Sequence, residues 1–576
     1  MLSGKMAKTN AKSAALTNDV SIATLVRTTL VALLVLRVGS VYASVGIAGV
    51  LVNTQDRWLL LLGLLLAGCS LLPIPAFAQP IALTRSIVWA LALLVGLAAY
   101  AGHYLLLMGY NLSRDEQMAV FDAQIFGAGK LVWPLAPHWQ VDAPALNLLF
   151  MMPVQHPVAW ASAYLPGNAM LRVAFGTLGD PALTGPALSA AAVLLVWRCA
   201  RLLWPGETEP QAVAVLLTAL SGQMVITGMT AYAMPAHLCL NLAWLWLFLQ
   251  GHRRADAGAL AVGFMATGLH QALPHPMFVA PFLLVMARRG EGRRLGLYVV
   301  VYGAIGVFWL SWPHLTQSLV AGTDIDQTAP ANDLVGRVLA LIVGNPSPVP
   351  LMAANLLRFC TWQAMPMIPL LVAGLFVARR DAIAFALAGG LVITIVVMAI
   401  ILAYQGHGFG YRYLHGLIGS AALLAGYGWR SLAAHHDRLR PMLWRALMLS
   451  GVALLPVEAA MAHRFYAPYA SADRRIAASG TDYVVVGIDD APFAQDLVHN
   501  RPDLANHPIR LAAEGIADPQ ALAARICRPG VQVGFLDGAL TQPIWSYFRV
   551  KPRRERNDAR LLADLRHFRC TIVVFR

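Results

Sequence analysis

Long apolar runs that recur between Leu30 and Ala462 are the feature of this sequence that most constrains its fold. Many of these runs approach or exceed the roughly 18 residues that an α-helix needs to cross a bilayer. Charged residues make up 12% of the 576 residues, and the mean hydropathy is +0.60. Because a soluble chain of this length would carry about twice that share of charge, the sequence predicts a mainly α-helical, polytopic membrane protein.

The apolar runs predict about thirteen transmembrane helices. The short run at 275–287 is also compatible with one arm of a re-entrant hairpin. Together the runs define a transmembrane region over residues 29–461. The expected spans cover residues 29–52, 58–78, 87–109, 184–204, 211–228, 231–250, 256–272, 275–287, 295–314, 364–378, 382–403, 412–431 and 441–461.

The basic residues predict the orientation of the chain. A net charge of +14 would suit a nucleic-acid-binding protein, but the arginines form short clusters at alternate helix ends, as the positive-inside rule describes. With residues 1–28 as a cytoplasmic tail, this rule places the loops 110–183 and 315–363, and everything after about residue 462, outside. We therefore expect a multi-pass protein of the bacterial inner membrane that has no nucleic-acid partner.

A change of composition after about residue 462 marks a separate domain. Charged residues become more frequent and strand-like runs alternate with helix-like stretches, which predicts a small periplasmic α/β domain over 462–576. Cys527 and Cys570 lie in this exported part, where the redox environment permits a disulfide, but the sequence leaves their pairing open. The expected strands are 483–488, 531–537 and 570–575, and the expected helices are 518–527 and 557–568.

A polar stretch at 110–134, YNLSRDEQMAVFDAQIFGAGKLVWP, interrupts the apolar region. Its apolar residues Met118, Phe121 and Ile125 recur at helical spacing. This pattern predicts an amphipathic helix over 114–128 at the outer interface of the bilayer.

The acidic pair Asp115 and Glu116 opens this expected helix. Ser113 and Glu116 match the Ser-x-x-Glu capping box, in which the two side chains satisfy each other's backbone donors. The box accounts for Glu116 as a helix start and leaves a functional role for this residue open. The helix dipole favours a first-turn aspartate by only about 0.3–1 kcal/mol, so Asp115 needs a further explanation.

Three short motifs in order resemble the GT-C superfamily of membrane glycosyltransferases, which includes protein O-mannosyltransferases and lipid A aminoarabinose transferases. The first is an Asp-Glu pair in the first large outer loop, followed by a surface helix that ends in a Gly-Lys-Leu step. SAYLPGNAMLRVAFGTLG at 162–179 is similar to a Tyr-x-x-Pro-Gly segment of bacterial members, and FGYRYLHGLIGSAALLAGYG at 409–428 is similar to the Arg-Tyr-Leu start of a late span. The chain departs from the family in two extra spans before the Asp-Glu loop and in Leu165, where relatives often have proline.

The resemblance implies an inverting glycosyltransferase that moves a sugar from a polyprenyl-phosphate donor to a cell-envelope glycan, glycolipid or protein. It implies that Asp115 is the base that deprotonates the acceptor hydroxyl and that Glu116 is an auxiliary carboxylate. The chemistry is coherent, because a carboxylate within hydrogen-bond reach of a hydroxyl accelerates such a reaction by roughly 10²–10⁴.

The lipid phosphate that leaves in such a reaction needs fixed positive charges. Lys130 and Arg412 are the candidates, because the expected topology places both at the outer surface. His270 and His275 flank the turn LHQALPHP at the same level, although a histidine at a helix end is more often structural. Arg412 is also compatible with an interfacial anchor of its helix.

Three tyrosines, Tyr164, Tyr411 and Tyr413, are candidates to stack on or hydrogen-bond a sugar or acceptor, although tyrosine is also an ordinary residue of the membrane boundary. Asp324 and Asp326 in the outer loop are the only suggestion of a divalent-metal site, and a pair of carboxylates offers few ligands. We assign no cofactor and leave the metal open.

Three other functions are compatible with the same expected topology. A transporter or flippase would place ionisable groups and broken helices near the bilayer midplane, whereas the notable charges here lie at the outer helix ends. A non-catalytic envelope assembly protein would use the exported domain for binding. An O-antigen-ligase-like transferase would centre its site on a large later loop, so the early acidic pair favours a monosaccharide-phosphate donor.

Overall fold

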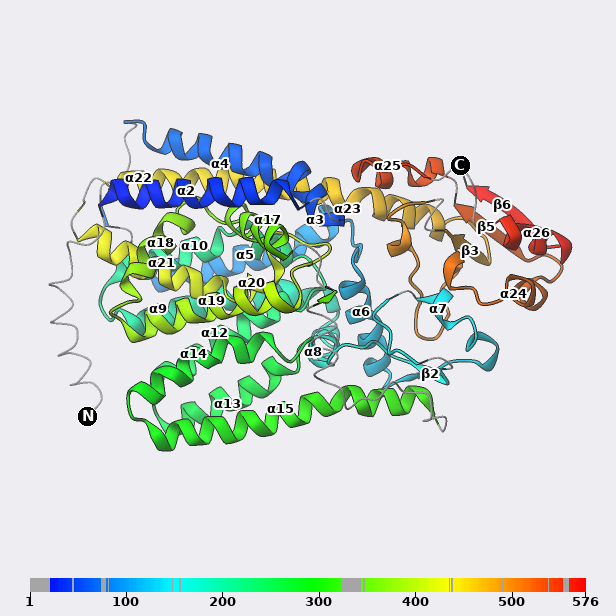
Figure 1. Ribbon diagram of the computed structural model, residues 1–576, viewed down its shortest axis with the longest axis horizontal. Coiled ribbons are helices and arrows are strands. Elements are labelled where there is room, and N and C mark those ends of the chain that lie inside the picture. The colour runs from blue at the N-terminus through cyan, green and yellow to red at the C-terminus, as the bar shows by residue number, and fades with distance from the viewer. Residues whose placement is uncertain are drawn as a thin grey trace.

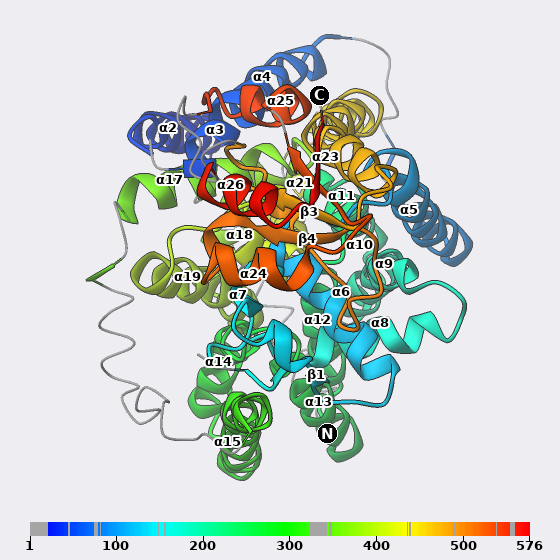
Figure 2. The same cartoon turned by 90° about the vertical axis from the view of Figure 1, so that its right-hand side faces the viewer.

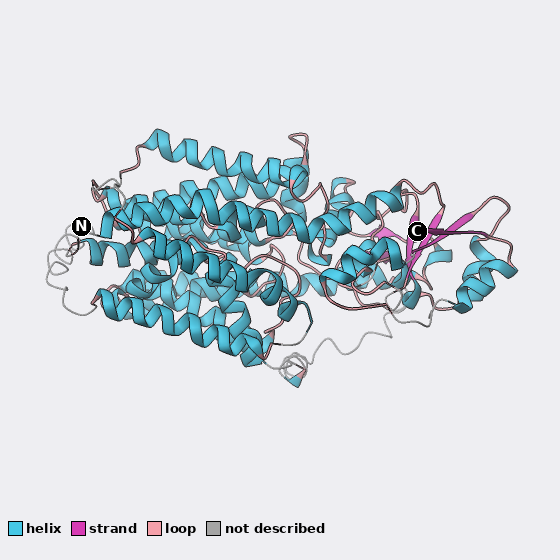
Figure 3. Ribbon diagram, turned by 90° about the horizontal axis from the view of Figure 1, so that it is seen from above, coloured by secondary structure: helices cyan, strands magenta, loops and turns pink. Residues whose placement is uncertain are grey.

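The protein consists of a long helical bundle with a smaller, sheet-containing part at one end (Figures 1 and 3). The computed structural model describes residues 21–575 apart from a few short segments and one longer one. Asp324 and Asp326, the aspartates considered for a divalent-metal site, lie outside the described residues. The segments not described are 44–45, 74–78, 81, 148, 155–156, 323–342, 345–347, 435, 437–438, 488–490, 537 and 553–558.

Seven helical segments of the described chain are long and apolar enough, by length and composition, to cross a membrane. The expected count of about thirteen is not confirmed. The segments are α2 (Ile22–Val41), α3–η1–α4 (Gly46–Ser70), α5 (Arg85–Leu105), η3–α9 (Pro181–Leu203), α15 (Gly292–Ala321), α19 (Ala382–Ile401) and α22–η5–α23 (Leu439–Ala477).

The remaining expected spans correspond to shorter helices within the bundle. The run expected at 211–228 is broken at Leu220 and Ser221, because the Ser221 hydroxyl caps the second of two helices by accepting a hydrogen bond from the Met224 amide at 3.2 Å. The shorter helices are α10 (Thr208–Ala219), α11 (Gly222–Thr227), α12 (Met234–Gln250), α13 (Arg253–Thr267), α14 (Pro274–Arg288), α18 (Met367–Val377), α20 (Arg412–His415) and α21 (Ile418–Ala433).

The boundaries expected for the first spans are wrong. Helix α2 ends at Val41, and the next span begins at Gly46, so the continuous span expected at 29–52 does not exist. Gly46 has a φ of 60°, a conformation that glycine adopts without steric cost. Uniformly apolar residues on both sides hide this break in the sequence.

The outer loop expected at 315–363 is partly helical. Helix α15 continues to Ala321, and α17 (Pro348–Thr361) packs against α2. Its residues Leu351 and Leu357 join Val52 in a small apolar core that is separate from the main core of the bundle. This helix was missed because its apolar face is interrupted by Asn355 and Arg358.

The segment between α5 and α9 lies between the bundle and the C-terminal part (Figures 1 and 2). A two-stranded antiparallel sheet pairs Trp133 with Trp160 and Pro134 with Ala159. The elements are α6 (Arg114–Gly127), β1 (Trp133–Pro134), η2 (Pro137–Trp139), α7 (Ala143–Leu146), β2 (Ala159–Trp160) and α8 (Gly167–Gly176).

The C-terminal part is an α/β domain with a parallel sheet in the order β4-β3-β5-β6. The expected strands and helices are present, and the strand β4 was missed. Helix α23 runs through the expected boundary at 461 and ends at Ala477. The elements are β3 (Tyr483–Val486), η6 (Gln495–Leu497), β4 (Ile509–Ala512), η7 (Ala513–Gly515), α24 (Pro519–Ile526), β5 (Gln532–Leu536), α25 (Gly538–Tyr547), α26 (Ala559–His567) and β6 (Thr571–Phe575).

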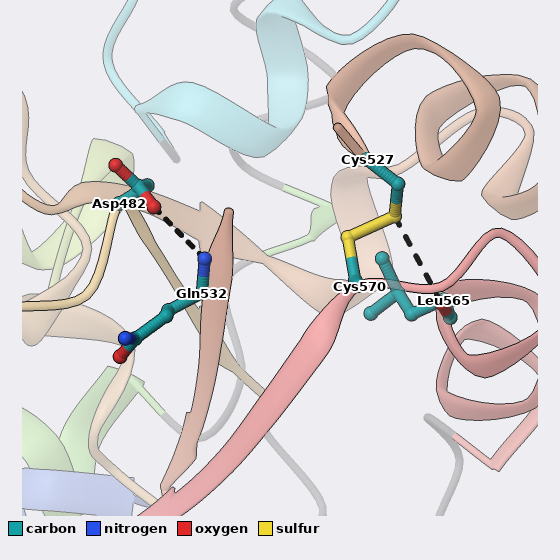
Figure 4. Close-up of a disulfide and its surroundings, with 5 residues drawn as sticks. All are labelled: Asp482, Cys527, Gln532, Leu565 and Cys570. Carbon is teal, nitrogen blue, oxygen red and sulfur yellow. Dashed lines mark hydrogen bonds between the residues drawn. A yellow bond between two sulfur atoms is a disulfide. The ribbon is translucent and has the colours of Figure 1, made fainter. Parts of the chain in front are cut away.

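A disulfide joins Cys527, directly after α24, to Cys570, directly before β6 (Figure 4). The pairing that the sequence left open is therefore present. It ties a helix to the edge strand of the sheet.

Helix α6 belongs to the core of this outer region. Met118, Phe121 and Ile125 are buried in one cluster with Val485 and Phe535 of the C-terminal sheet. The apolar face that was expected to lie in the bilayer interface therefore packs against protein. The reason is that the C-terminal domain, which comes much later in the chain, covers this face.

Candidate active site

The first turn of α6 is built as the sequence predicts. The Ser113 hydroxyl accepts a hydrogen bond from the Glu116 amide at 3.3 Å, and Glu116 Oε2 accepts one from the Ser113 amide at 3.0 Å. This is the expected capping box.

Glu116 is fully buried and joins three elements. Besides the cap, its carboxylate accepts hydrogen bonds from the Ala231 amide at 3.3 Å and from the Tyr466 hydroxyl at 2.9 Å. Burial raises the pKa of Glu116 above its ordinary value, although these hydrogen bonds oppose the shift. Its surroundings are those of a residue that ties α6 to the turn before α12 and to α23.

Asp115 faces a different environment from its neighbour. Its carboxylate forms an ion pair with Arg412 and accepts a hydrogen bond from the Tyr164 hydroxyl. The side chain of Asp115 is 12% exposed and that of Arg412 is 9% exposed. Burial alone would raise the pKa of Asp115, but the charge of Arg412, with smaller contributions from His270 and Tyr164, lowers it. Asp115 is therefore an ionised carboxylate at neutral pH.

A cavity of about 280 Å³ opens beside Asp115 and Tyr164. It lies where the helical bundle, the segment that follows α5 and the C-terminal domain meet. Its polar wall is contributed by Ser113, Arg114, Asp115, Tyr164, His270, Gln271, Tyr404, Gln405, His407, Arg412, Tyr413, Gln495 and Asp496.

Arg412, at the start of α20, is fixed by its neighbours as well as by Asp115. Its guanidinium donates to the Gln405 carbonyl, and its amide donates to Gln405 Oε1 at 2.9 Å. A narrow second cavity of about 30 Å³ extends from Arg412 between α12, α14 and α19, past Asn241 and Thr394. Arg412 therefore lies between the larger cavity and the interior of the bundle.

His270 and Tyr413 lie at the same place as Asp115, as the sequence predicts. Both line the two cavities. The His270 ring lies against the Tyr164 ring, with centroids 3.8 Å apart and an angle of 33° between the planes. Asp115, Arg412, His270, Tyr164 and Tyr413 thus come together, although they are far apart in the sequence.

Four other candidate residues do not line this cavity. Lys130 is exposed, and its ammonium lies 3.8 Å from the centroid of the Trp133 ring. His275 is buried and hydrogen-bonded to Asn241 Oδ1 at 2.7 Å and to the Tyr302 hydroxyl at 2.8 Å. Tyr411 and Glu116 are fully buried. Arg412 therefore lines the cavity, whereas Lys130 does not.

The C-terminal domain supplies cavity residues that the sequence reasoning missed. Asp496 lies in η6, where its carboxylate contacts His407 Nε2 at 2.9 Å and Arg114 Nε at 3.5 Å. The Arg114 guanidinium also donates to the Val498 carbonyl at 2.6 Å. The polar, glycine-rich run at 405–411 was the available signal for His407, which contacts Asp496 from the segment between α19 and α20.

No group of three or more His, Cys, Asp or Glu side chains in the described part of the chain is placed to hold a metal ion. Arg114 and Arg412 are arginines that line the cavity.

Fold and site together define a class: a multi-pass membrane protein in which a carboxylate–arginine pair faces a cavity between the helical bundle and a C-terminal α/β domain. No protein-family model matches the chain, and no curated protein matches it. Solved structures do.

The chain is similar to ArnT from Cupriavidus metallidurans in the apo state, with 14% identity, 81% of this chain and 88% of that chain covered, and a TM-score of 0.46. For the same protein bound to undecaprenyl phosphate the identity is 15%, the coverage 84% and 89%, and the TM-score 0.43. The chain is also similar to the archaeal oligosaccharyltransferase AglB from Archaeoglobus fulgidus, in complex with an inhibitory peptide and a dolichol-phosphate. The identity is 12%, the match covers 74% of this chain and 64% of that chain, and the TM-score is 0.40. ArnT and AglB are members of the GT-C superfamily, the class that the sequence motifs resemble. Similarity of this extent assigns no activity.

Proposed function

We propose that the protein is an inverting membrane glycosyltransferase that transfers a sugar from a polyprenyl-phosphate donor to a hydroxyl group of a cell-envelope acceptor, on the periplasmic face of a bacterial inner membrane. One observation carries the proposal. A largely buried, ionised carboxylate, Asp115, and a buried guanidinium, Arg412, face the same cavity at the end of the bundle that meets the C-terminal domain.

Asp115 is the base in this proposal. As the acceptor oxygen attacks the anomeric carbon, Asp115 takes the hydroxyl proton, and the bond between the anomeric carbon and the phosphate oxygen breaks on the opposite face. The electron pair of that bond leaves with the lipid phosphate. A positioned carboxylate of this kind contributes roughly 10²–10⁴ in rate.

Arg412 is the group that receives the phosphate charge. A guanidinium binds phosphate with directed, charge-assisted hydrogen bonds, and a buried one acts in a low dielectric. When phosphate engages Arg412, the attraction that lowers the pKa of Asp115 is shared with the phosphate. Donor binding therefore makes Asp115 a stronger base at the moment when a base is needed.

Tyr164, His270 and Tyr413 surround this pair and offer rings and polar atoms to a sugar. Lys130 and His275 lie away from the cavity and have no role in this scheme. Glu116 holds α6 in place.

The decisive experiment measures transfer by purified protein in lipid nanodiscs. A panel of undecaprenyl-phosphate monosaccharides is incubated with envelope extract from cells that lack the gene, and the release of undecaprenyl phosphate and the gain of sugar mass in the extract are followed by mass spectrometry. The parent protein should release undecaprenyl phosphate from at least one donor, and Asp115→Asn should be slower by about 10²–10⁴.

Asp503→Asn, an exposed aspartate in the C-terminal domain, is the matched control and should keep parental turnover. Equal turnover by Asp115→Asn and the parent would remove Asp115 as the base. Absence of turnover with every donor by a folded parent protein would sink the transferase proposal.

A further inference from the structure

A buried ion pair lies among the N-terminal helices, outside the residues assigned to the cavity. Asp56, at the end of η1 (Val52–Asp56), faces Arg358 of α17, with Asp56 Oδ2 and Arg358 Nε 3.2 Å apart. Both side chains are 0% exposed. Asp56 Oδ1 also accepts hydrogen bonds from Trp362 Nε1 at 2.8 Å and from the Thr361 hydroxyl at 3.2 Å. The carboxylate is therefore held by Arg358 and Thr361 of α17 and by Trp362, which directly follows this helix.

Arg358 also reaches the wall of the cavity. Its guanidinium donates to the Gly408 carbonyl at 2.6 Å, and one turn earlier Asn355 donates to the Ala403 carbonyl at 2.6 Å. Both carbonyls belong to residues 402–411, which we call the wall segment. This segment lines the cavity and leads directly into Arg412. Helix α17 is therefore hydrogen-bonded to the backbone that carries the proposed phosphate-binding group.

The hydrogen bond from Arg358 to Gly408 lies directly beside Arg412. A Cβ atom added at Gly408 would be 2.8 Å from Arg412 Cγ, so no side chain separates this backbone from the arginine stem. Gly408 has a φ of 138°, which disfavours other residues. The position of the Gly408 carbonyl and the position of the Arg412 side chain are therefore coupled by contact.

Apolar packing places the N-terminal spans against the wall segment. Ala48 and Val52 share a core with Leu351 and Ala403, and Tyr404 packs against this cluster. The two spans that the sequence adds before the Asp-Glu loop thus support the wall segment.

Stability alone does not account for the ion pair. Removing two charges from water costs several kcal/mol per ion, and replacing such a pair by apolar side chains is often neutral or stabilising. Arg358 Nη1 has no hydrogen-bond partner among the described residues, so the pair is incompletely satisfied. A pair that is expensive and still donates to Gly408 is better explained by the geometry that it fixes.

We propose that Asp56 and Arg358 are positioning residues that hold the wall segment and, through it, the Arg412 guanidinium in the orientation that binds the lipid phosphate. This inference rests on the proposed function. Asp56 orients and neutralises Arg358, and Arg358 donates a hydrogen bond to the Gly408 carbonyl. Gly408 in turn contacts the aliphatic part of the Arg412 side chain and fixes its position.

The test measures binding of undecaprenyl phosphate to the full-length protein in nanodiscs by native mass spectrometry. The double variant Asp56→Asn/Arg358→Met removes the charges together, so it should fold, and it should bind the probe about fivefold more weakly. In an Arg412→Met background the same double change should weaken binding no further, because its effect acts through Arg412. A purely structural defect would multiply with the loss of Arg412.

Arg294→Met is the matched control, because Arg294 forms a similar ion pair with Asp256 at 2.7 Å between α13 and α15 and does not line the cavity. It should leave the affinity unchanged. If the double variant does not fold, Arg358→Lys replaces it, since a point charge can pair with Asp56 but cannot span to Gly408 as a guanidinium does.

Parental affinity in the double variant, or in a folded Arg358→Lys variant where that one is used, would overturn the positioning role while leaving the proposed function intact. So would effects that multiply in the Arg412→Met background. A parent protein that does not bind undecaprenyl phosphate would instead overturn the proposed function and this inference with it.

Discussion

At the scale of single residues, the adjacent carboxylates Asp115 and Glu116 show how burial and partners divide roles. Glu116 points into the protein and receives backbone and tyrosine hydrogen bonds. Asp115 points toward the cavity and receives a guanidinium and a phenol. Successive helical residues differ in direction by about 100°, which is enough to separate the two environments.

The charge of Arg412 should control the ionisation of Asp115. The pKa of Asp115 is lowered in the folded protein, so this carboxylate is ionised whenever the pH is above the ordinary pKa of an aspartate, about 3.9. Its favourable pairing with Arg412 is lost only as the pH falls through the lowered pKa. Arg412→Gln leaves the burial and removes the main opposing charge, so the pKa of Asp115 should rise above the ordinary value.

Carbodiimide, which modifies protonated carboxyl groups, reports this change by mass spectrometry of the peptide that contains Asp115. At pH 5 the parent should remain unmodified at Asp115 and Arg412→Gln should be modified. His270→Gln, which removes a smaller contribution, should shift the labelling curve less. Identical curves for parent and Arg412→Gln would contradict the electrostatic account.

Glu116→Gln should act on stability. Glutamine retains one acceptor oxygen but turns an amide toward groups that donate to Glu116, which leaves a buried donor unsatisfied at a cost of about 1–3 kcal/mol. We expect a lower melting temperature with little change in turnover per folded molecule. Tyr466→Phe, which removes one of the same hydrogen bonds, should lower it less. Loss of turnover without loss of stability in Glu116→Gln would restore the auxiliary catalytic role.

At the scale of elements, the site depends on which helix faces are covered. Helix α6 shows ordinary amphipathic spacing, yet its apolar face packs against the C-terminal sheet and its first turn faces the cavity. Helix α17 reaches the wall segment because its polar residues Asn355 and Arg358 lie one turn apart, on the same side.

Arg114 should be the main polar connection between α6 and the C-terminal domain. Its buried guanidinium contacts Asp496 and the Val498 carbonyl. Arg114→Met leaves these groups without that partner, and breaking a buried pair in this way costs about 3–5 kcal/mol. Limited proteolysis should therefore cleave the segment around 495–498 faster than in the parent. Arg501→Met removes an exposed ion pair worth about 0–1 kcal/mol and should not accelerate cleavage there.

At the scale of the whole molecule, the cavity exists only where three distant parts of the chain meet. The start of α6, the segment before α20 and the η6 turn of the C-terminal domain each supply one wall. The sheet of that domain lies over the bundle when the protein is viewed from the domain side (Figure 2). A change that loosens the domain should therefore reach the cavity.

The disulfide between Cys527 and Cys570 should stabilise this domain. It closes a loop with a sequence separation of 43, and removal of such a crosslink typically costs about 2–4 kcal/mol. The double variant Cys527→Ser/Cys570→Ser should show a lower melting temperature for the domain than the parent under oxidising conditions. Reductant should lower the melting temperature of the parent and leave that of the variant unchanged. A parent that is insensitive to reductant would show that the crosslink contributes little.

The sequence by itself indicated the apolar helical region, the capping box at Ser113 and Glu116, and three of the four strands of the C-terminal sheet, because each follows from local periodicity or composition. It also indicated Asp115, through a short motif, and Arg412, through the expected topology, as candidate site residues. Only the tertiary structure decided that Lys130 lies away from Arg412, that Asp496 forms part of the cavity, and that Asp56 and Arg358 support its wall. These facts depend on which distant surfaces cover one another, and a local sequence pattern carries no information about that choice.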